Sequence, residues 1–163
     1  MEKTYTSKDI IEMAVQSKAR GVDLYIFLAR NSGNYHVGQL FTELAKDEQR
    51  HKLQLEKLLS SLKGKEREEA YPGERSLYLK ALVDANTFNC SETCKKSLET
   101  TINEEDALRA GITFEKDFML FLHDLKMQAT GKESEKVVDG LIEDEIKHLS
   151  EIFKMKDKLE KGK

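Results

Sequence analysis

The sequence predicts an all-α protein, a four-helix bundle made of two helical hairpins. Only one proline and nine glycines interrupt the 163 residues. A chain rich in Leu, Lys, Glu and Ala favours long helices over the frequent turns of an all-β domain. Four segments carry apolar residues at helical spacing. This length suits one domain with its own core, so residues 1–163 are expected to fold as a single unit.

The first hairpin is expected to occupy roughly the first 60 residues. Thr6 or Ser7 can cap a first helix that runs to Arg30. Its apolar stripe consists of Ile11, Ala14, Val15, Val22, Tyr25, Ile26 and Ala29. A turn at residues 32–34 separates it from a second helix, because Ser, Gly and Asn follow one another there. The stripe of that helix is Val37, Leu40, Phe41, Leu44, Leu55, Leu58 and Leu59. Helices joined by so short a turn should pack as antiparallel neighbours.

A long crossover is expected over residues 63–102, where the helical periodicity weakens. Pro72 and Gly73 break this stretch, although residues 76–85 have the pattern of a short helix. The crossover therefore separates two hairpins rather than adding a long helix to the bundle.

The second hairpin begins at Asn103, which can cap a third helix together with Asp106. The stripe of this helix is Leu108, Gly111, Ile112, Met119 and Leu122. The chain turns again around Gly131. A fourth stripe follows at Val138, Leu141, Ile142, Leu149 and Ile152. The lysine-rich residues 154–163 are expected to be a solvated helix end.

The second hairpin repeats the first at a constant offset of 97 residues without a gap, counted from Asp47 to Asp144. Residues 47–51 (DEQRH) correspond to residues 144–148 (DEIKH). In each half a polar residue, Lys18 or Glu115, stands 30 positions before the Glu of the ExxH motif. Such a repeat indicates two copies of one supersecondary unit.

Six ionisable residues fall on the apolar faces of these helices. They are Lys18, Glu48, His51, Glu115, Glu145 and His148. Burying an unpaired charge is costly, so such carboxylates need protons, opposite charges or metal ions. Glu and His at i and i+3 project from one helical face. Mixed oxygen and imidazole ligands suit iron or manganese, with zinc as a further candidate. The sequence therefore predicts a metal site in the core.

This arrangement resembles the ferritin-like di-iron carboxylate proteins, specifically their rubrerythrin-like branch, whose helices supply Glu, ExxH, Glu and ExxH in chain order. The likeness covers residues 8–60 and 104–157, with local matches at 11–14 (IEMA), 41–45 (FTELA) and 114–117 (FEKD). It implies a ferritin-like bundle with one or two iron ions as cofactor. The metal ligands that it implies are Glu48, His51, Glu115, Glu145 and His148.

Lys18 departs from this family, because the corresponding position of the first helix carries a ligand Glu there. The change removes an anion and places a cation against the site. We expect one tightly bound metal, or two with a weakened first-helix side, and a Lys18 pair with Glu48 or Glu145 when metal is absent. Three alternatives are open: a neutral lysine that ligates metal, a stem that packs while its ammonium reaches solvent, and a metal-free salt-bridge network that includes Glu115.

Three further residues bear on the site, namely Tyr25, His36 and His123. Tyr25 lies seven residues after Lys18, where the family often has a tyrosine that hydrogen-bonds a ligand, but a core aromatic residue has the same spacing. His36 and His123 lie off the ligand stripe and are expected on the surface.

The resemblance implies a redox enzyme that reduces peroxide or dioxygen, or oxidises ferrous iron. The alternative is a non-catalytic bundle that binds or senses metal, or serves only as a scaffold. Cys90 and Cys94 do not form a CxxC pair, so no rubredoxin-type iron site is expected and a separate protein would donate electrons. Dimerisation through helix faces is a further expectation from the family.

The charge and hydropathy patterns limit which partners and which cellular location are expected. The formal net charge is −3 with both signs interspersed, which argues against binding to nucleic acid. No apolar run approaches the ~20 residues that cross a bilayer, and the first residues are polar rather than a signal core. A cytoplasmic protein without membrane contact is therefore expected.

Overall fold

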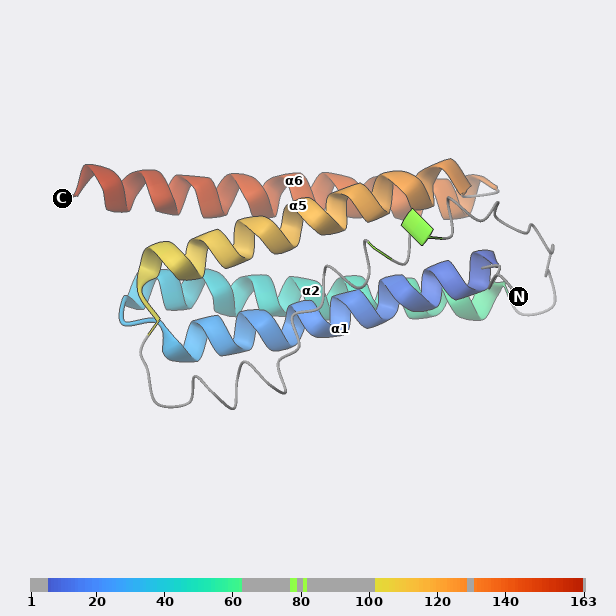
Figure 1. The fold of residues 1–163 in the computed structure, drawn as a ribbon. Coiled ribbons are helices and arrows are strands. Elements are labelled where there is room, and N and C mark those ends of the chain that lie inside the picture. Colours follow the sequence, from blue (N-terminus) through green and yellow to red (C-terminus); the bar gives the residue numbers. More distant parts are fainter. Residues whose placement is uncertain (1–5, 63–76, 79–80, 82–101, 129–130, 163) are drawn as a thin grey trace.

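The computed structural model describes residues 6–62, 77–78, 81, 102–128 and 131–162. Four long helices account for most of them (Figure 1). Their bounds are α1 (Ser7–Asn31), α2 (Tyr35–Ser61), α5 (Glu104–Gln128) and α6 (Lys132–Lys161). The predicted all-α four-helix bundle is confirmed.

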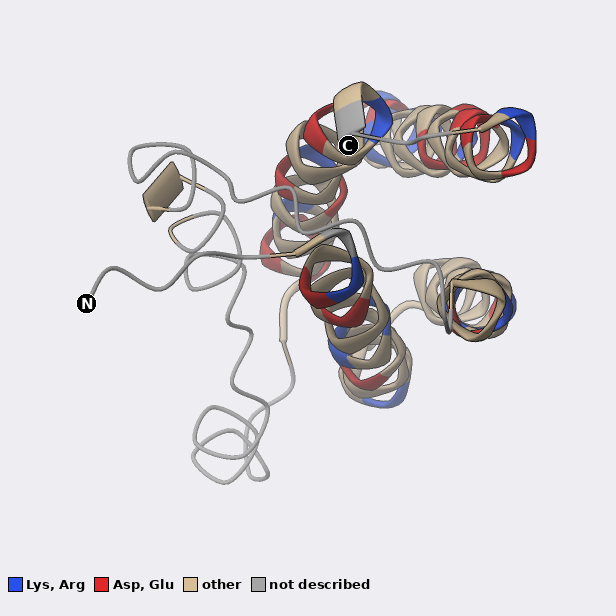
Figure 2. Cartoon of the chain, turned by 90° about the vertical axis from the view of Figure 1, so that its right-hand side faces the viewer, with Lys and Arg blue, Asp and Glu red and all other residues tan. Residues whose placement is uncertain are grey.

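The helices form two antiparallel hairpins that lie against each other (Figure 1). Helix α1 packs on α2 and α5, and α6 packs on α5 and α2, so every neighbouring pair runs antiparallel. Helix α2 ends at the opposite end of the bundle from the start of α5. Figure 2 looks along the helices and shows acidic and basic residues mixed on the bundle.

Within the predicted crossover, Leu77, Tyr78 and Ala81 have helical backbone, in agreement with the short helix expected there. The rest of the crossover up to residue 101 lies outside the described residues, including Cys90 and Cys94. In the described ranges every helix is too short or too polar to span a lipid bilayer.

Side-chain caps set the start of three of the helices. Thr6 and Asp9 form a capping box on α1, as expected for one of the two candidate caps. The Asn34 side chain accepts hydrogen bonds from two backbone N–H groups of the first turn of α2. Asn103 accepts one from the backbone of Asp106 in α5, as predicted. Gly131 precedes α6 with φ of 103°, a conformation that favours glycine.

The core consists of two apolar clusters with a polar layer between them. Along α1, for example, Ile11 and Ala14 belong to the first cluster and Leu24 and Tyr25 to the second. The buried polar residue Lys18 comes between them. On the other three helices the buried polar residues likewise lie between members of the two clusters, so the polar layer crosses the bundle at one level.

The apolar stripe predicted for the first helix is partly wrong. Ile26 is 36% exposed, whereas Leu24, Phe27 and Leu28 are buried. The inward face alternates steps of three and four residues through Lys18 and Tyr25 to Leu28, as bundle packing requires. The predicted stripe therefore lies partly at the edge of that face.

Candidate metal centre

All six ionisable residues that the sequence places on apolar faces lie in the polar layer. Their exposed fraction is 2% for His148 and 0% for the others, which are Lys18, Glu48, His51, Glu115 and Glu145. Each helix contributes to the layer. The sequence predicted this set of buried residues, and the structure brings the set together.

Four of these side chains each offer a ligand atom within 4.8 Å of the others, namely Glu48, His51, Glu145 and His148. The two members of each ExxH motif are three residues apart on one helix, so they point in the same direction. Because α2 and α6 are antiparallel neighbours, the two motifs face each other across the bundle. The imidazole rings stack with centroids 5.4 Å apart.

Each histidine is oriented by an aspartate of the other hairpin. The Nε2 atom of His51 lies 3.2 Å from Asp144, and that of His148 lies 3.3 Å from Asp47. The Nδ1 atoms therefore face the centre of the layer. Arg50 ties the two aspartates together, at 3.0 Å from Asp47 and 3.3 Å from Asp144.

Asp47, Asp144 and Arg50 are parts of the site that the sequence pattern did not predict. Both aspartates were visible in the repeat, because each precedes the Glu of an ExxH motif at the same position. Carboxylates that hold the outer nitrogen of a ligating histidine are a regular feature of metal sites. The repeat could therefore have indicated both aspartates from the sequence.

Glu115 lies between Tyr25 of α1 and His148 of α6 and contacts both. Its Oε1 accepts a hydrogen bond from the Tyr25 hydroxyl, and the same oxygen is 3.4 Å from His148 Nδ1. The expectation that Tyr25 hydrogen-bonds a carboxylate is confirmed. The Tyr25 ring also stacks on Phe41 with centroids 5.6 Å apart, so it serves the core as well.

The Lys18 ammonium bridges the two ExxH glutamates. Its Nζ lies 2.9 Å from Glu48 and 2.5 Å from Glu145, and the ring centroid of Phe118 is 3.8 Å away. The alternative in which the ammonium reaches solvent is wrong, because the side chain is fully buried. The expected pairing with Glu48 or Glu145 is confirmed, and it involves both.

These contacts shift the pKa values of the ionisable side chains of the metal-free layer in different directions. Burial lowers the pKa of Lys18, but Glu145 and Glu48 outweigh that effect and the pKa is raised. Although burial favours the neutral acid, Lys18 leads the interactions that hold the pKa of Glu145 well below its usual range. Burial and the Glu145 charge raise the pKa of Glu115 well above its usual value. Burial lowers the pKa of His148, but the nearby carboxylates of Glu115 and Glu145 raise it to about 11.

The layer contains buried ligand atoms that form no hydrogen bond of acceptable geometry. They include Nδ1 of His51 and His148 and Oε2 of Glu115 and Glu145. Buried polar atoms without a hydrogen bond are costly. Carboxylate oxygens and imidazole nitrogens are donors that divalent iron, manganese and zinc accept. The residues present therefore fit a divalent metal ion.

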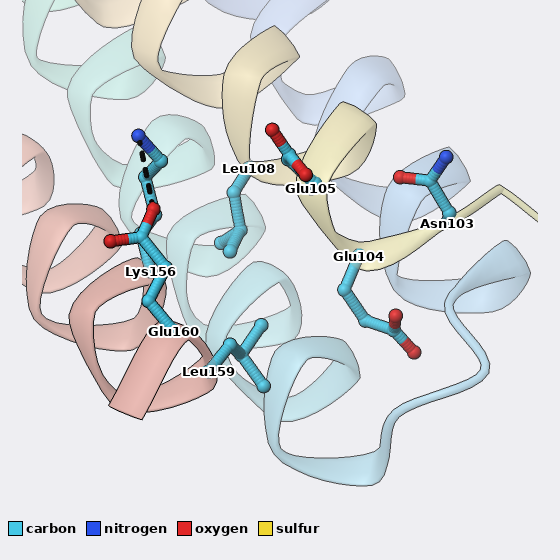
Figure 3. A pocket seen from close by; sticks show the side chains of 7 residues that line it. All are labelled: Asn103, Glu104, Glu105, Leu108, Lys156, Leu159 and Glu160. Atoms are coloured by element: carbon cyan, nitrogen blue, oxygen red, sulfur yellow. Dashed lines mark ion pairs between the residues drawn. The ribbon is translucent and has the colours of Figure 1, made fainter. Parts of the chain in front are cut away.

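Two of the surface pockets lie between neighbouring helices. One, between α2 and α6, is lined in part by Asp144, the residue that contacts His51. The other lies where α5 starts and α6 ends, and includes the Lys156–Glu160 ion pair drawn in Figure 3. Its lining residues belong to neither ExxH motif.

His36 and His123 are exposed, as expected.

Comparison with known proteins agrees with this arrangement. A family model described as Rubrerythrin matches residues 9–156. A structure from Thermotoga maritima, provisionally described as a ferritin-like diiron-carboxylate protein, is similar with a TM-score of 0.70 and 20% identity, over 96% of this chain and 98% of that one. A hypothetical protein from Methanococcus jannaschii has a TM-score of 0.63 and 18% identity, over 94% and 80% of the respective chains. Among curated proteins there is no match.

Proposed function

Because the chain belongs to the rubrerythrin family, we propose that it is a non-haem iron protein that reduces peroxide or dioxygen, or oxidises ferrous iron, at its buried Glu/His cluster. The main support is the convergence of five ligand-type side chains in one buried layer of the core. They are Glu48, His51, Glu115, Glu145 and His148. Iron bound there supplies the electron-transfer chemistry.

The residues around the cluster position and shield it. Asp47 and Asp144 hold the outer nitrogens of the two histidines, which keeps each Nδ1 directed inward. Tyr25 fixes the orientation of Glu115 through its hydroxyl. The apolar clusters above and below exclude bulk water, which strengthens every electrostatic interaction in the layer.

A reductive function needs a source of electrons. Reduction of one peroxide to two waters takes two electrons and two protons. The sequence offers no CxxC pair for an iron site of its own, so a separate donor protein would supply the electrons. Iron oxidation would instead use ferrous iron as the substrate.

A second candidate is a protein that binds or senses metal without turnover. Lys18 favours it, because its ammonium already bridges Glu48 and Glu145, two of the carboxylates that would hold a metal. Under this alternative the cluster holds metal and the ammonium suppresses redox chemistry.

The decisive experiment loads the protein with ferrous iron without oxygen, measures retained iron, and then adds peroxide. The proposal expects retained iron and consumption of peroxide. Retained iron without consumption would favour the non-catalytic candidate. The double variant His51→Ala/His148→Ala should retain no iron, and unchanged iron content in that variant would contradict both candidates. Loading with Mn²⁺ or Zn²⁺ in parallel tests which metal the cluster prefers.

A further inference from the structure

The Lys18 ammonium places a positive charge inside the polar layer. Its Nζ lies within 2.9 Å of carboxylate oxygens from two different helices, Glu48 on α2 and Glu145 on α6. The repeat pairs Lys18 with Glu115, so the two halves of the site differ in charge at this position. One side of the layer has a built-in cation, and the other has a carboxylate.

The two oxygens of Glu145 serve different sides of the layer. Oε1 contacts Lys18 at 2.5 Å and His51 Nδ1 at 3.2 Å. Oε2 is 3.3 Å from His148 Nδ1, which also lies 3.4 Å from Glu115. His51 therefore shares the side of Lys18, whereas His148 and Glu115 form the other side.

The Lys18 side is also closed by packing. The Phe118 ring covers the ammonium with its centroid 3.8 Å from Nζ. A Cβ atom at Gly21, one turn further along α1, would lie 2.6 Å from Glu48 Oε2 and 2.7 Å from the Phe114 ring. The space around the ammonium is thus already filled by protein atoms.

The charges of the layer balance with one metal and not with two. Glu48, Glu115 and Glu145 carry three negative charges as ligands, which one ammonium and one divalent cation offset when both histidines are neutral. With no further anion bound, a second divalent cation would leave two positive charges in excess in a buried layer, and unbalanced buried charge is strongly unfavourable.

We propose that the Lys18 ammonium replaces one of the two cations of a di-iron centre, so that this cluster binds a single divalent metal on the side of His148 and Glu115. The inference rests on the proposed iron-binding function and specifies its stoichiometry. Under this proposal His148 is a metal ligand, whereas His51 packs beside the ammonium.

The test is metal stoichiometry, measured after anaerobic equilibration with Fe²⁺ or Mn²⁺ and removal of excess metal. The wild type should retain one ion per chain, and bound Mn²⁺ should give the electron paramagnetic resonance spectrum of an isolated ion. Lys18→Glu adds a fourth carboxylate and should raise the stoichiometry to two, with a spin-coupled Mn²⁺ pair. Lys8→Glu makes the same charge change at an exposed position of α1 and should leave one ion.

The histidines provide an independent measurement on the wild-type chain. His148→Gln should weaken Mn²⁺ binding by more than about 100-fold, beyond the range for outer partners of a ligand, and His51→Gln by less than about tenfold. In the Lys18→Glu background, His51→Gln should return two ions to one. Two ions in the wild type, or equal losses for both histidines, would overturn the single-metal inference while iron binding stands. No retained metal in the wild type would overturn the proposed function itself.

Discussion

Asp47 and Asp144 determine the orientation of the two histidines, although neither points into the polar layer. Each lies on the hairpin opposite its histidine, so each contact also links α2 to α6. Asp144 is the better shielded of the two, with 21% of its side chain exposed against 42% for Asp47. Residues of this kind commonly change metal affinity without contacting the metal.

Asp47→Asn should weaken Mn²⁺ binding about 10- to 100-fold, because His148 loses the carboxylate that fixes its ring. A competition titration with a chelator of known affinity measures the change. Asp144→Asn is the matched comparison, because it makes the same chemical change beside His51. Its effect should be smaller, and an equal loss in both variants would show that both histidines bind the metal.

Metal affinity should increase with pH. The pKa of His148 is raised to about 11 in the metal-free layer, where burial lowers it and the carboxylates of Glu115 and Glu145 raise it more. Its ring is therefore protonated at neutral pH and must lose that proton before Nδ1 can ligate. We expect affinity for Mn²⁺ to rise by about tenfold or more per pH unit between about pH 6 and 9.

Calorimetry in two buffers of different ionisation enthalpy measures the protons released on binding. At least one proton per bound ion is expected, and more if Glu115 also ionises, because its pKa is raised well above the usual value mainly by burial. An affinity that does not change with pH would show that the His148 ring is already neutral in the metal-free protein.

At the scale of the helix, small residues decide how closely α1 and α5 approach the layer. A Cβ atom at Gly21 would meet Glu48 at 2.6 Å and the Phe114 ring at 2.7 Å. At Gly111, the repeat equivalent of Ala14, a Cβ atom would lie 3.1 Å from Phe41 and 3.2 Å from Ile152. Helices α1 and α5 thus have glycine where side chains of the layer and of the apolar cluster come closest.

Gly21→Ala should lower the free energy of unfolding by about 1–3 kcal/mol, because the added methyl group overpacks the layer. Gly140→Ala is the matched control in the interior of α6, where an added Cβ meets nothing within 4 Å. It should raise the free energy of unfolding by about 0.5–1 kcal/mol, since alanine favours the helix more. Urea unfolding of both variants checks the pair, and a neutral Gly21→Ala would show that Glu48 and Phe114 can shift.

At the scale of the molecule, the polar layer joins all four helices at one level between two apolar clusters. In the metal-free state Lys18 links three of them, because it extends from α1 to carboxylates on α2 and α6. Glu115 extends the network to α5, where the Tyr25 hydroxyl of α1 contacts it. A metal in this layer would cross-link the hairpins, so binding should be coupled to the stability of the whole bundle.

Saturating metal should therefore stabilise the fold. At a free Mn²⁺ concentration of about 100 times Kd, linkage predicts a gain of about 2.7 kcal/mol in the free energy of unfolding. Denaturant unfolding with and without the ion, followed by reversal with a chelator, measures it. His148→Gln should show almost no gain at the same concentration, and a full gain in that variant would place the stabilising metal elsewhere.

The sequence by itself determined the four helices, two of their caps, and the set of ionisable residues that would be buried. These features depend on local spacing, since i and i+3 on one helix always share a face. Only the tertiary structure decided that Asp47 and Asp144 cross to the opposite histidines, that Ile26 lies outside the core face, and that Lys18 contacts both ExxH glutamates. Such contacts depend on how far each helix is rotated and how closely its neighbour approaches, and neither quantity is encoded in the spacing of residues along a single helix.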